Sequence, residues 1–138
     1  MKPTHMMKRI LLDTNGYAAF KRKDPIAVGV IRSVEYIGLS VVVVGELLGG
    51  FKGGSKEAKN IEELNEFMDS PRVHLLQIDE ETAEFYAKIY WDLKKKGKPI
   101  PSNDMWVAAS AMRDGLSLFT LDEHFNSVDG LILKSGAL

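Results

Sequence analysis

The sequence predicts an α/β fold, a twisted parallel sheet flanked by helices, and three observations lead to this class. Short apolar segments alternate with longer segments that fit helices along most of the chain. The run Val41–Val44 has no polar alternation, as expected for a strand that is covered on both faces. The chain has 138 residues and neither an internal repeat nor a linker, so we expect one domain.

The elements follow in order along the chain. The predicted strands are Arg9–Asp13, Ser40–Val44, Val73–Ile78, Leu116–Thr120 and Leu131–Leu133. The predicted helices are Gly16–Lys23, Ile26–Tyr36, Gly45–Phe51, Lys56–Met68, Glu80–Lys96 and Asn103–Asp114. Ser55 and Ser102 are typical N-caps, and Gly115 is a typical helix stop.

Composition limits the protein class. The chain has no cysteine, which excludes disulfides and thiolate metal sites and favours a reducing cytoplasm. No apolar run approaches the roughly 20 residues of a membrane span, and the start lacks the apolar stretch of a signal peptide. Because Met7 is a second plausible start, we expect residues 1–6 to be a tail or a cloning remnant and residues 7–138 to form the domain. The net charge of −1 argues against a passive nucleic-acid coat, but not against an enzyme that acts on nucleic acid.

Four acids stand at comparable places along the predicted fold. Asp13 ends the first strand, Glu46 follows the second, Asp104 opens a helix, and Asp122 comes two residues after Thr120. Each has an ordinary alternative: a helix cap, a solvated helix residue, a first-turn acid near the helix dipole, and a turn residue. Because sites in open α/β sheets lie beyond the carboxyl ends of the strands, all four belong at one edge. Such a pocket calls for a hard divalent cation, Mg²⁺ or Mn²⁺.

Small residues lie beneath two of these acids. Asp104 shares a helical face with Ala108 and Ala111, and Glu46 shares one with Gly49 and Gly50. We expect the backbone to approach its neighbours closely at both places, which would hold the carboxylates near a common point.

Other polar residues carry weaker signals. His5, His74 and His124 have no zinc-site spacing, and we expect His124 on a surface turn. Four lysines are candidates for RNA contact, although a solvated helix end explains them equally well; these are Lys52, Lys94, Lys95 and Lys98. Trp91 and Trp106 are more often core or interface residues than stacking platforms.

The chain resembles the PIN-domain ribonucleases, and specifically the VapC-type toxins of prokaryotic toxin–antitoxin pairs, over nearly its whole length from Met7. The resemblance rests on four motifs, which are Ile10–Asn15, Gly45–Gly50, Asn103–Ala109 and Leu118–Phe125. Pro99-Ile100-Pro101 is stiffer than the glycine-rich entry common in relatives, so loop contacts to RNA are not carried over.

The resemblance implies metal-dependent cleavage of RNA by a homodimer that a small cognate antitoxin inhibits. Asp13, Glu46, Asp104 and Asp122 match the family's four acids, and Asn15 and Thr120 match polar positions near them. Our hypothesis is that Asp13 and Asp104 bind the metal directly and that Asp122 completes the site directly or through water. Glu46 then holds the attacking water or a metal-bound water, while Asn15 and Thr120 orient carboxylates.

Three alternative functions stay open from the sequence alone. The first is a PIN nuclease of RNA processing or quality control. The second is a receiver-like Mg²⁺-binding module without hydrolysis, although Asp13 lacks the second acid that a receiver needs there. The third is a protein that only sequesters RNA or an antitoxin.

Overall fold

Four short parallel strands form the centre of the molecule in a computed structural model that describes residues 8–134. The strands are β1 (Arg9–Leu12), β2 (Tyr36–Ser40), β3 (Val73–Leu76) and β4 (Ser117–Phe119), and their order in the sheet is β3-β2-β1-β4. Every neighbouring pair is parallel. The predicted α/β class is therefore confirmed, while the expectation for residues 1–6 lies outside the described part of the chain.

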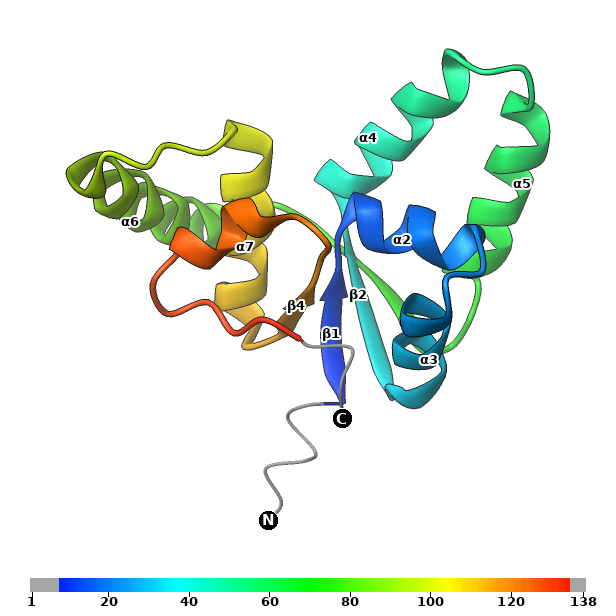
Figure 1. The fold of residues 1–138 in the computed structure, drawn as a ribbon, viewed down its shortest axis with the longest axis horizontal. Coiled ribbons are helices and arrows are strands. Elements are labelled where there is room, and N and C mark those ends of the chain that lie inside the picture. Colours follow the sequence, from blue (N-terminus) through cyan, green and yellow to red (C-terminus); the bar gives the residue numbers. More distant parts are fainter. Residues whose placement is uncertain (1–7, 135–138) are drawn as a thin grey trace.

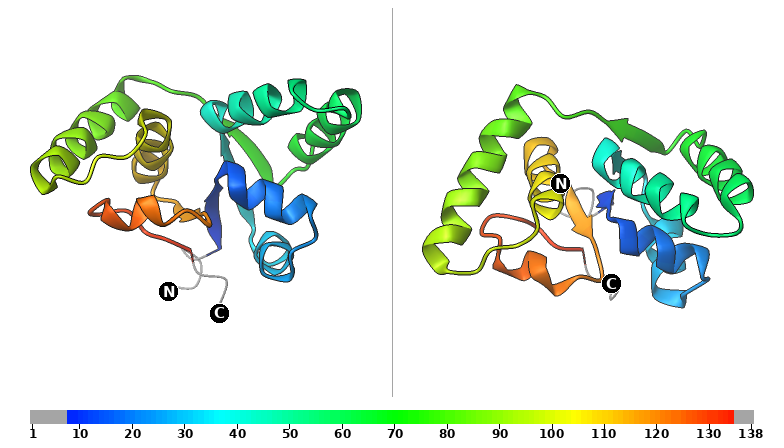
Figure 2. Two further views of the ribbon diagram at one scale, coloured as in Figure 1. Left: turned by 45° about the horizontal axis from the view of Figure 1, so that its top comes forward. Right: turned by 90° about the horizontal axis from the view of Figure 1, so that it is seen from above.

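Helices cover both faces of this sheet, as predicted (Figure 1). Helices α6 and α7 lie on one side and α2 to α5 on the other, and a view from above separates the same two groups (Figure 2). The bounds are α2 Thr14–Lys21, α3 Pro25–Ser33, α4 Val41–Lys52, α5 Glu57–Met68, α6 Glu80–Lys96 and α7 Ser102–Asp114, and a 3₁₀ helix, η1, spans Glu123–Ser127. No helix within residues 8–134 has both the length and the apolar character to cross a membrane.

The prediction for Val41–Val44 was wrong, because this run begins α4 instead of forming a strand. The hydroxyl of Ser40 accepts a hydrogen bond from the backbone N–H of Val42 at 3.1 Å and so caps the helix. The true strand is the preceding segment, β2, which the sequence placed partly in the helix Ile26–Tyr36. A buried apolar run fits the first turns of a helix as well as it fits a strand.

The last predicted strand, Leu131–Leu133, is reduced to one parallel bridge between Leu118 and Leu133. The N–H of Leu118 donates to the carbonyl of Ile132 at 2.8 Å, and the N–H of Lys134 donates to the carbonyl of Leu118 at 2.8 Å. Among the expected helix ends, Gly115 ends α7 with φ 65° as predicted, whereas the N-caps are Lys56 and Pro101 in place of Ser55 and Ser102.

The start of α2 is pressed against the ends of two strands. A Cβ added at Gly16 would lie 2.9 Å from the side chain of Leu12 and 3.1 Å from the carbonyl oxygen of Phe119. Only glycine therefore fits where α2 meets β1 and β4. This close approach fixes the residues just before it, Asp13 and Asn15, at the carboxyl edge of the sheet.

Candidate active site

An acidic cleft of about 460 Å³ lies at the carboxyl edge of the sheet. Its walls come from the segment after β1, from α4, from the start of α7 and from the segment after β4. All four predicted acids line it. The residues that define this acidic cleft are Asp13, Thr14, Asn15, Ala18, Glu46, Pro101, Asn103, Asp104, Asp122 and His124.

Asp13 is buried and does not act as a helix cap. It occupies the N-cap position of α2, but its side chain makes no capping hydrogen bond. Instead its Oδ2 accepts a hydrogen bond from Thr120 Oγ1 at 2.8 Å. Only 4% of Asp13 is exposed. Burial raises the pKa of its carboxyl to about 6, and the charges of Asp104 and Glu46 add to this effect.

Thr120 connects three parts of the cleft through one hydroxyl. While it donates to Asp13, it accepts a hydrogen bond from the backbone N–H of Asp122 at 3.0 Å. Asn15 Oδ1 accepts from the backbone N–H of Leu121 at 2.9 Å and lies 3.2 Å from the Thr120 hydroxyl. The two residues predicted to orient carboxylates thus lie beside the acids, and Thr120 contacts Asp13 directly.

Glu46 is held from two sides, so it is not a freely solvated helix residue. It lies in the second turn of α4, not in the first turn as predicted, because the helix begins at Val41. Thr14 Oγ1 donates to one carboxylate oxygen at 2.5 Å, and Asn103 Nδ2 donates to the other. Neither donor was predicted, although each stands directly beside a predicted acid in the sequence.

Small residues are buried beneath Asp104 in α7, as predicted, but the prediction of the same packing beneath Glu46 in α4 was wrong. Ala108 and Ala111 are completely buried beneath Asp104, as predicted. Gly49 and Gly50 are exposed, and a Cβ added to either would meet nothing within 4 Å. Glu46 is therefore positioned by its hydrogen bonds and not by a close approach of the α4 backbone.

Asp104 and Asp122 face one another at the other wall of the cleft. Asp104 lies in the first turn of α7 with 8% exposure, and burial raises its pKa, with Asp122 and Glu46 adding to the shift. Asp122 caps η1 by accepting a hydrogen bond from the backbone N–H of His124 at 2.9 Å. The turn interpretation of Asp122 is therefore correct, and its carboxylate belongs to the cluster as well.

His124 completes this wall, which the sequence did not predict. Its Nδ1 lies 3.1 Å from Asp122 Oδ1 and 3.5 Å from Asp104 Oδ2. One ligand atom from each of these three residues lies within 4.8 Å of the others. The sequence feature that could have indicated this is the spacing of two residues between Asp122 and His124. Asp122 caps the backbone N–H of His124, and the imidazole then lies beside the acids.

The donor set of the cleft fits a divalent cation. Among the described residues that line it, four are acids and none is lysine or arginine. Two of the acids are buried and have raised pKa values, because the cost of burying their carboxylates outweighs the hydrogen bonds they accept and, at Asp104, the nearby imidazole of His124. Carboxylate oxygens are the ligands that hard divalent ions prefer. The cluster can therefore hold a divalent metal ion.

The lysines predicted to contact RNA do not line the cleft. Lys52 pairs with Glu57 at 3.2 Å, and Lys94 lies over the rings of Tyr90 and Trp91 at 5.7 and 5.4 Å. Lys95 and Lys98 are exposed. Their contact with RNA stays a prediction.

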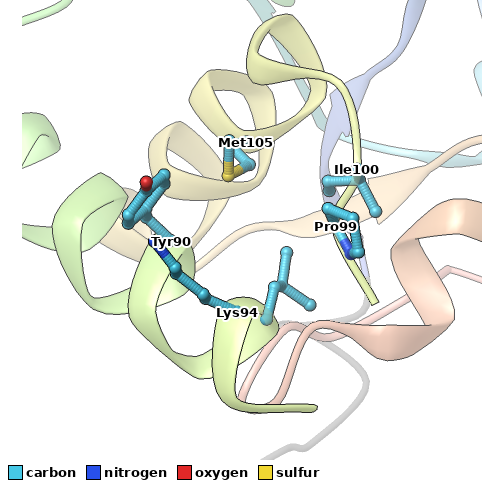
Figure 3. Close-up of a pocket in the computed structure, with 6 residues that line it drawn as sticks. Tyr90, Lys94, Pro99, Ile100 and Met105 are labelled. Atoms are coloured by element: carbon cyan, nitrogen blue, oxygen red, sulfur yellow. The ribbon is translucent and has the colours of Figure 1, made fainter. Parts of the chain in front are cut away.

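Lys94 and Tyr90 instead border an apolar groove of about 370 Å³ between α6, α7 and the segment that joins them (Figure 3). Trp91, beside the groove, is 55% exposed, whereas Trp106 stacks on Tyr86 with ring centroids 4.1 Å apart. The two tryptophans thus have different environments, and only Trp91 presents a large apolar surface to the outside.

The sequence matches the family model of the PIN domain over residues 10–131. Ribonuclease VapC4 of Mycobacterium tuberculosis is 32% identical over 88 residues, which cover 64% of this chain and 68% of that protein. Ribonuclease VapC2 of Rickettsia felis is 26% identical over 130 residues, which cover 91% and 96% of the two chains. A crystal structure of VapBC2 from Rickettsia felis, bound to a DNA fragment from their promoter, matches with a TM-score of 0.81 at 23% identity, covering 90% of this chain and 96% of that one.

Proposed function

Because the chain belongs to the PIN-domain family, we propose that it is a metal-dependent endoribonuclease and the VapC-type toxin of a toxin–antitoxin pair. The observation that carries this proposal is the acidic cleft, where four acids from four separate segments meet with neither lysine nor arginine among the described lining residues. Relatives that cover most of the chain are named ribonucleases, which supports the same activity. The family match also favours a nuclease over the receiver-like alternative.

We assign the metal to Asp13, Asp104 and Asp122, with Glu46 next to it. A divalent ion held there would supply Lewis-acid chemistry: it would polarise the scissile phosphate, make a bound water more acidic and stabilise the leaving oxygen. The ion is Mg²⁺ or Mn²⁺, because the donors are mainly oxygens.

The side chains of the cleft orient the acids and provide a proton acceptor for the attacking water. Thr120 orients Asp13 through the 2.8 Å hydrogen bond and also fixes the backbone of Asp122, so one hydroxyl sets two of the acids. Thr14 and Asn103 hold both oxygens of Glu46, which leaves the remaining lone pairs to accept a proton from the attacking water.

The activity is tested with purified protein and a mixture of structured and single-stranded RNAs. We expect cleavage with Mn²⁺ or Mg²⁺ and none with a chelator. Asp104→Asn should abolish cleavage while keeping the fold, as judged by circular dichroism and melting temperature. Retained cleavage in Asp104→Asn would remove its assigned role, and absence of cleavage by the wild type under every metal condition would favour a protein that only sequesters RNA or antitoxin.

A small antitoxin is the partner that the resemblance implies. We propose that it is encoded beside this gene and that the pair acts in the cytoplasm, in keeping with the absence of cysteine. Co-expression of a tagged chain with the adjacent gene should give a stable complex without ribonuclease activity. If no neighbouring product binds, the alternative of a PIN nuclease in RNA processing is preferred.

A second copy of the chain is the other partner. We propose that it packs on the exposed aromatic face of α6, formed by Tyr90 and Trp91. Trp91→Glu should then convert a dimer into a monomer in light scattering, whereas Lys59→Glu, at an exposed position of α5 on the other side of the sheet, should not. A dimer that survives Trp91→Glu would place the interface elsewhere.

A further inference from the structure

The imidazole of His124 is placed by the backbone and not by chance contact with the acids. The backbone N–H of His124 donates to Oδ1 of Asp122, the residue that caps η1, and the next residue, Phe125, is completely buried in the core. The turn is thus anchored on both sides of His124. Although 55% of its side chain is exposed, Nδ1 lies 3.1 Å from Asp122 and 3.5 Å from Asp104.

This arrangement gives the cleft a nitrogen donor among its oxygens. The ligand atoms of Asp104, Asp122 and His124 lie within 4.8 Å of one another. His124 Nδ1 is 3.1 Å from Asp122 and 3.5 Å from Asp104, separations that a single ion can bridge with bonds of about 2.0–2.3 Å. Mg²⁺ prefers a complete shell of oxygens, whereas imidazole nitrogen favours transition metals.

We propose that His124 is a ligand of the divalent ion and makes the cleft select Mn²⁺ over Mg²⁺. The inference rests on the proposed function to the extent that Asp104 and Asp122 hold a divalent ion. It goes further, because it assigns a ligand outside the four acids and a preference between the two ions.

A metal-binding role of His124 can be distinguished by measurement from the simplest alternative, in which its imidazole only balances the negative charge of the acids. A charge-balancing group acts on two ions of equal charge to the same extent. A nitrogen ligand acts mainly on Mn²⁺. The ratio of the two dissociation constants therefore separates the two roles without any measurement of activity.

The test uses the full chain, the chloride salts of Mn²⁺ and Mg²⁺, and one pH for all variants. Isothermal titration should show that His124→Gln weakens Mn²⁺ binding about tenfold and changes Mg²⁺ binding by less than about twofold. His74→Gln is the matched control, because His74 stacks on Tyr36 and does not line the cleft. An unchanged ratio of Mn²⁺ to Mg²⁺ affinity in His124→Gln would overturn the proposal.

A spectroscopic measurement on the wild type keeps the proposal testable if the variant does not fold. Pulsed electron paramagnetic resonance of the Mn²⁺-loaded chain should show coupling to a directly bound nitrogen, and its absence would overturn the assignment. Asp104→Asn distinguishes the two levels of failure. If Asp104→Asn no longer binds Mn²⁺ but the wild type shows no nitrogen coupling, the acids bind the metal and His124 is not a ligand. If the wild type binds neither Mn²⁺ nor Mg²⁺, the proposed metal site itself is contradicted.

Discussion

At the scale of single residues, Asp13 makes the metal-free protein sensitive to pH. Its pKa is about 6 in the folded chain and 3.8 in the reference state, so the folded protein binds more protons between these values. Stability from this group is therefore greatest below about pH 4, falls as pH rises to about 6, and stays lower above that. The ionised carboxylate of Asp13 therefore lowers the stability of the metal-free protein, and a bound cation would offset this cost.

Asp13→Asn should therefore stabilise the metal-free protein at neutral pH, by up to about 3 kcal/mol in the free energy of unfolding. The amide keeps an acceptor for Thr120 but carries no buried charge. Urea denaturation in chelator at several pH values measures this, with the exposed Asp69→Asn as control. The gain should vanish near pH 4, and a variant that is less stable than wild type at pH 7 would contradict the assigned cause.

Thr120 is the residue whose loss should disturb two acids at once. Thr120→Val removes the donor to Asp13 and the acceptor for the N–H of Asp122, so we expect a loss of about 2 kcal/mol and reduced RNA cleavage. Thr120→Ser keeps the hydroxyl and should retain most of both. Equal behaviour of the two variants in denaturation and cleavage assays would show that the hydroxyl has no such role.

Among the helices, α2 needs a glycine at position 16 for its packing, whereas α4 does not need the glycine at position 49. Gly16→Ala should destabilise the chain by about 1–3 kcal/mol, because the new Cβ meets Leu12 and the backbone of Phe119. Gly49→Ala, with open space around it, should stabilise α4 by about 0.5–1 kcal/mol. Chemical denaturation of both variants tests the pair, and the same sign for both would contradict this packing.

Individual elements also show which parts of the fold could be predicted from the sequence. Helix α6 was predicted with its full bounds, since its caps and its pattern agree. The segment Val41–Val44 was not, because its apolar run fits two structures and only the cap at Ser40 and the pairing of β2 with its neighbours decide between them.

Within the site, the acids were predictable and their partners were not. Strands that end at one edge bring their terminal residues together, which local sequence can indicate. The contacts of Glu46 with Thr14 and Asn103 span 32 and 57 residues and depend on how α2, α4 and α7 pack. Contacts of this kind follow from tertiary structure, as does the approach of His124 to Asp104.

At the scale of the whole molecule, metal binding and folding are linked through the cleft. The acids come from segments that lie far apart in the chain, so the unfolded chain has no preformed site for the ion. Mn²⁺ at about 100 times its dissociation constant should add about 2.7 kcal/mol of stability and raise the melting temperature by several degrees. Asp104→Asn should remove most of this increase, and an unchanged wild-type melting curve at millimolar Mn²⁺ would count against the metal site.

The most direct test of the central claim, that the four acids form one metal pocket, is anomalous diffraction from crystals grown with Mn²⁺. If the acids form one pocket, a manganese peak should appear in the acidic cleft, bound by Asp13, Asp104 and Asp122, with Glu46 close enough to hold a water on it. Absence of a peak there at saturating Mn²⁺, or a peak only at surface carboxylates, would contradict it.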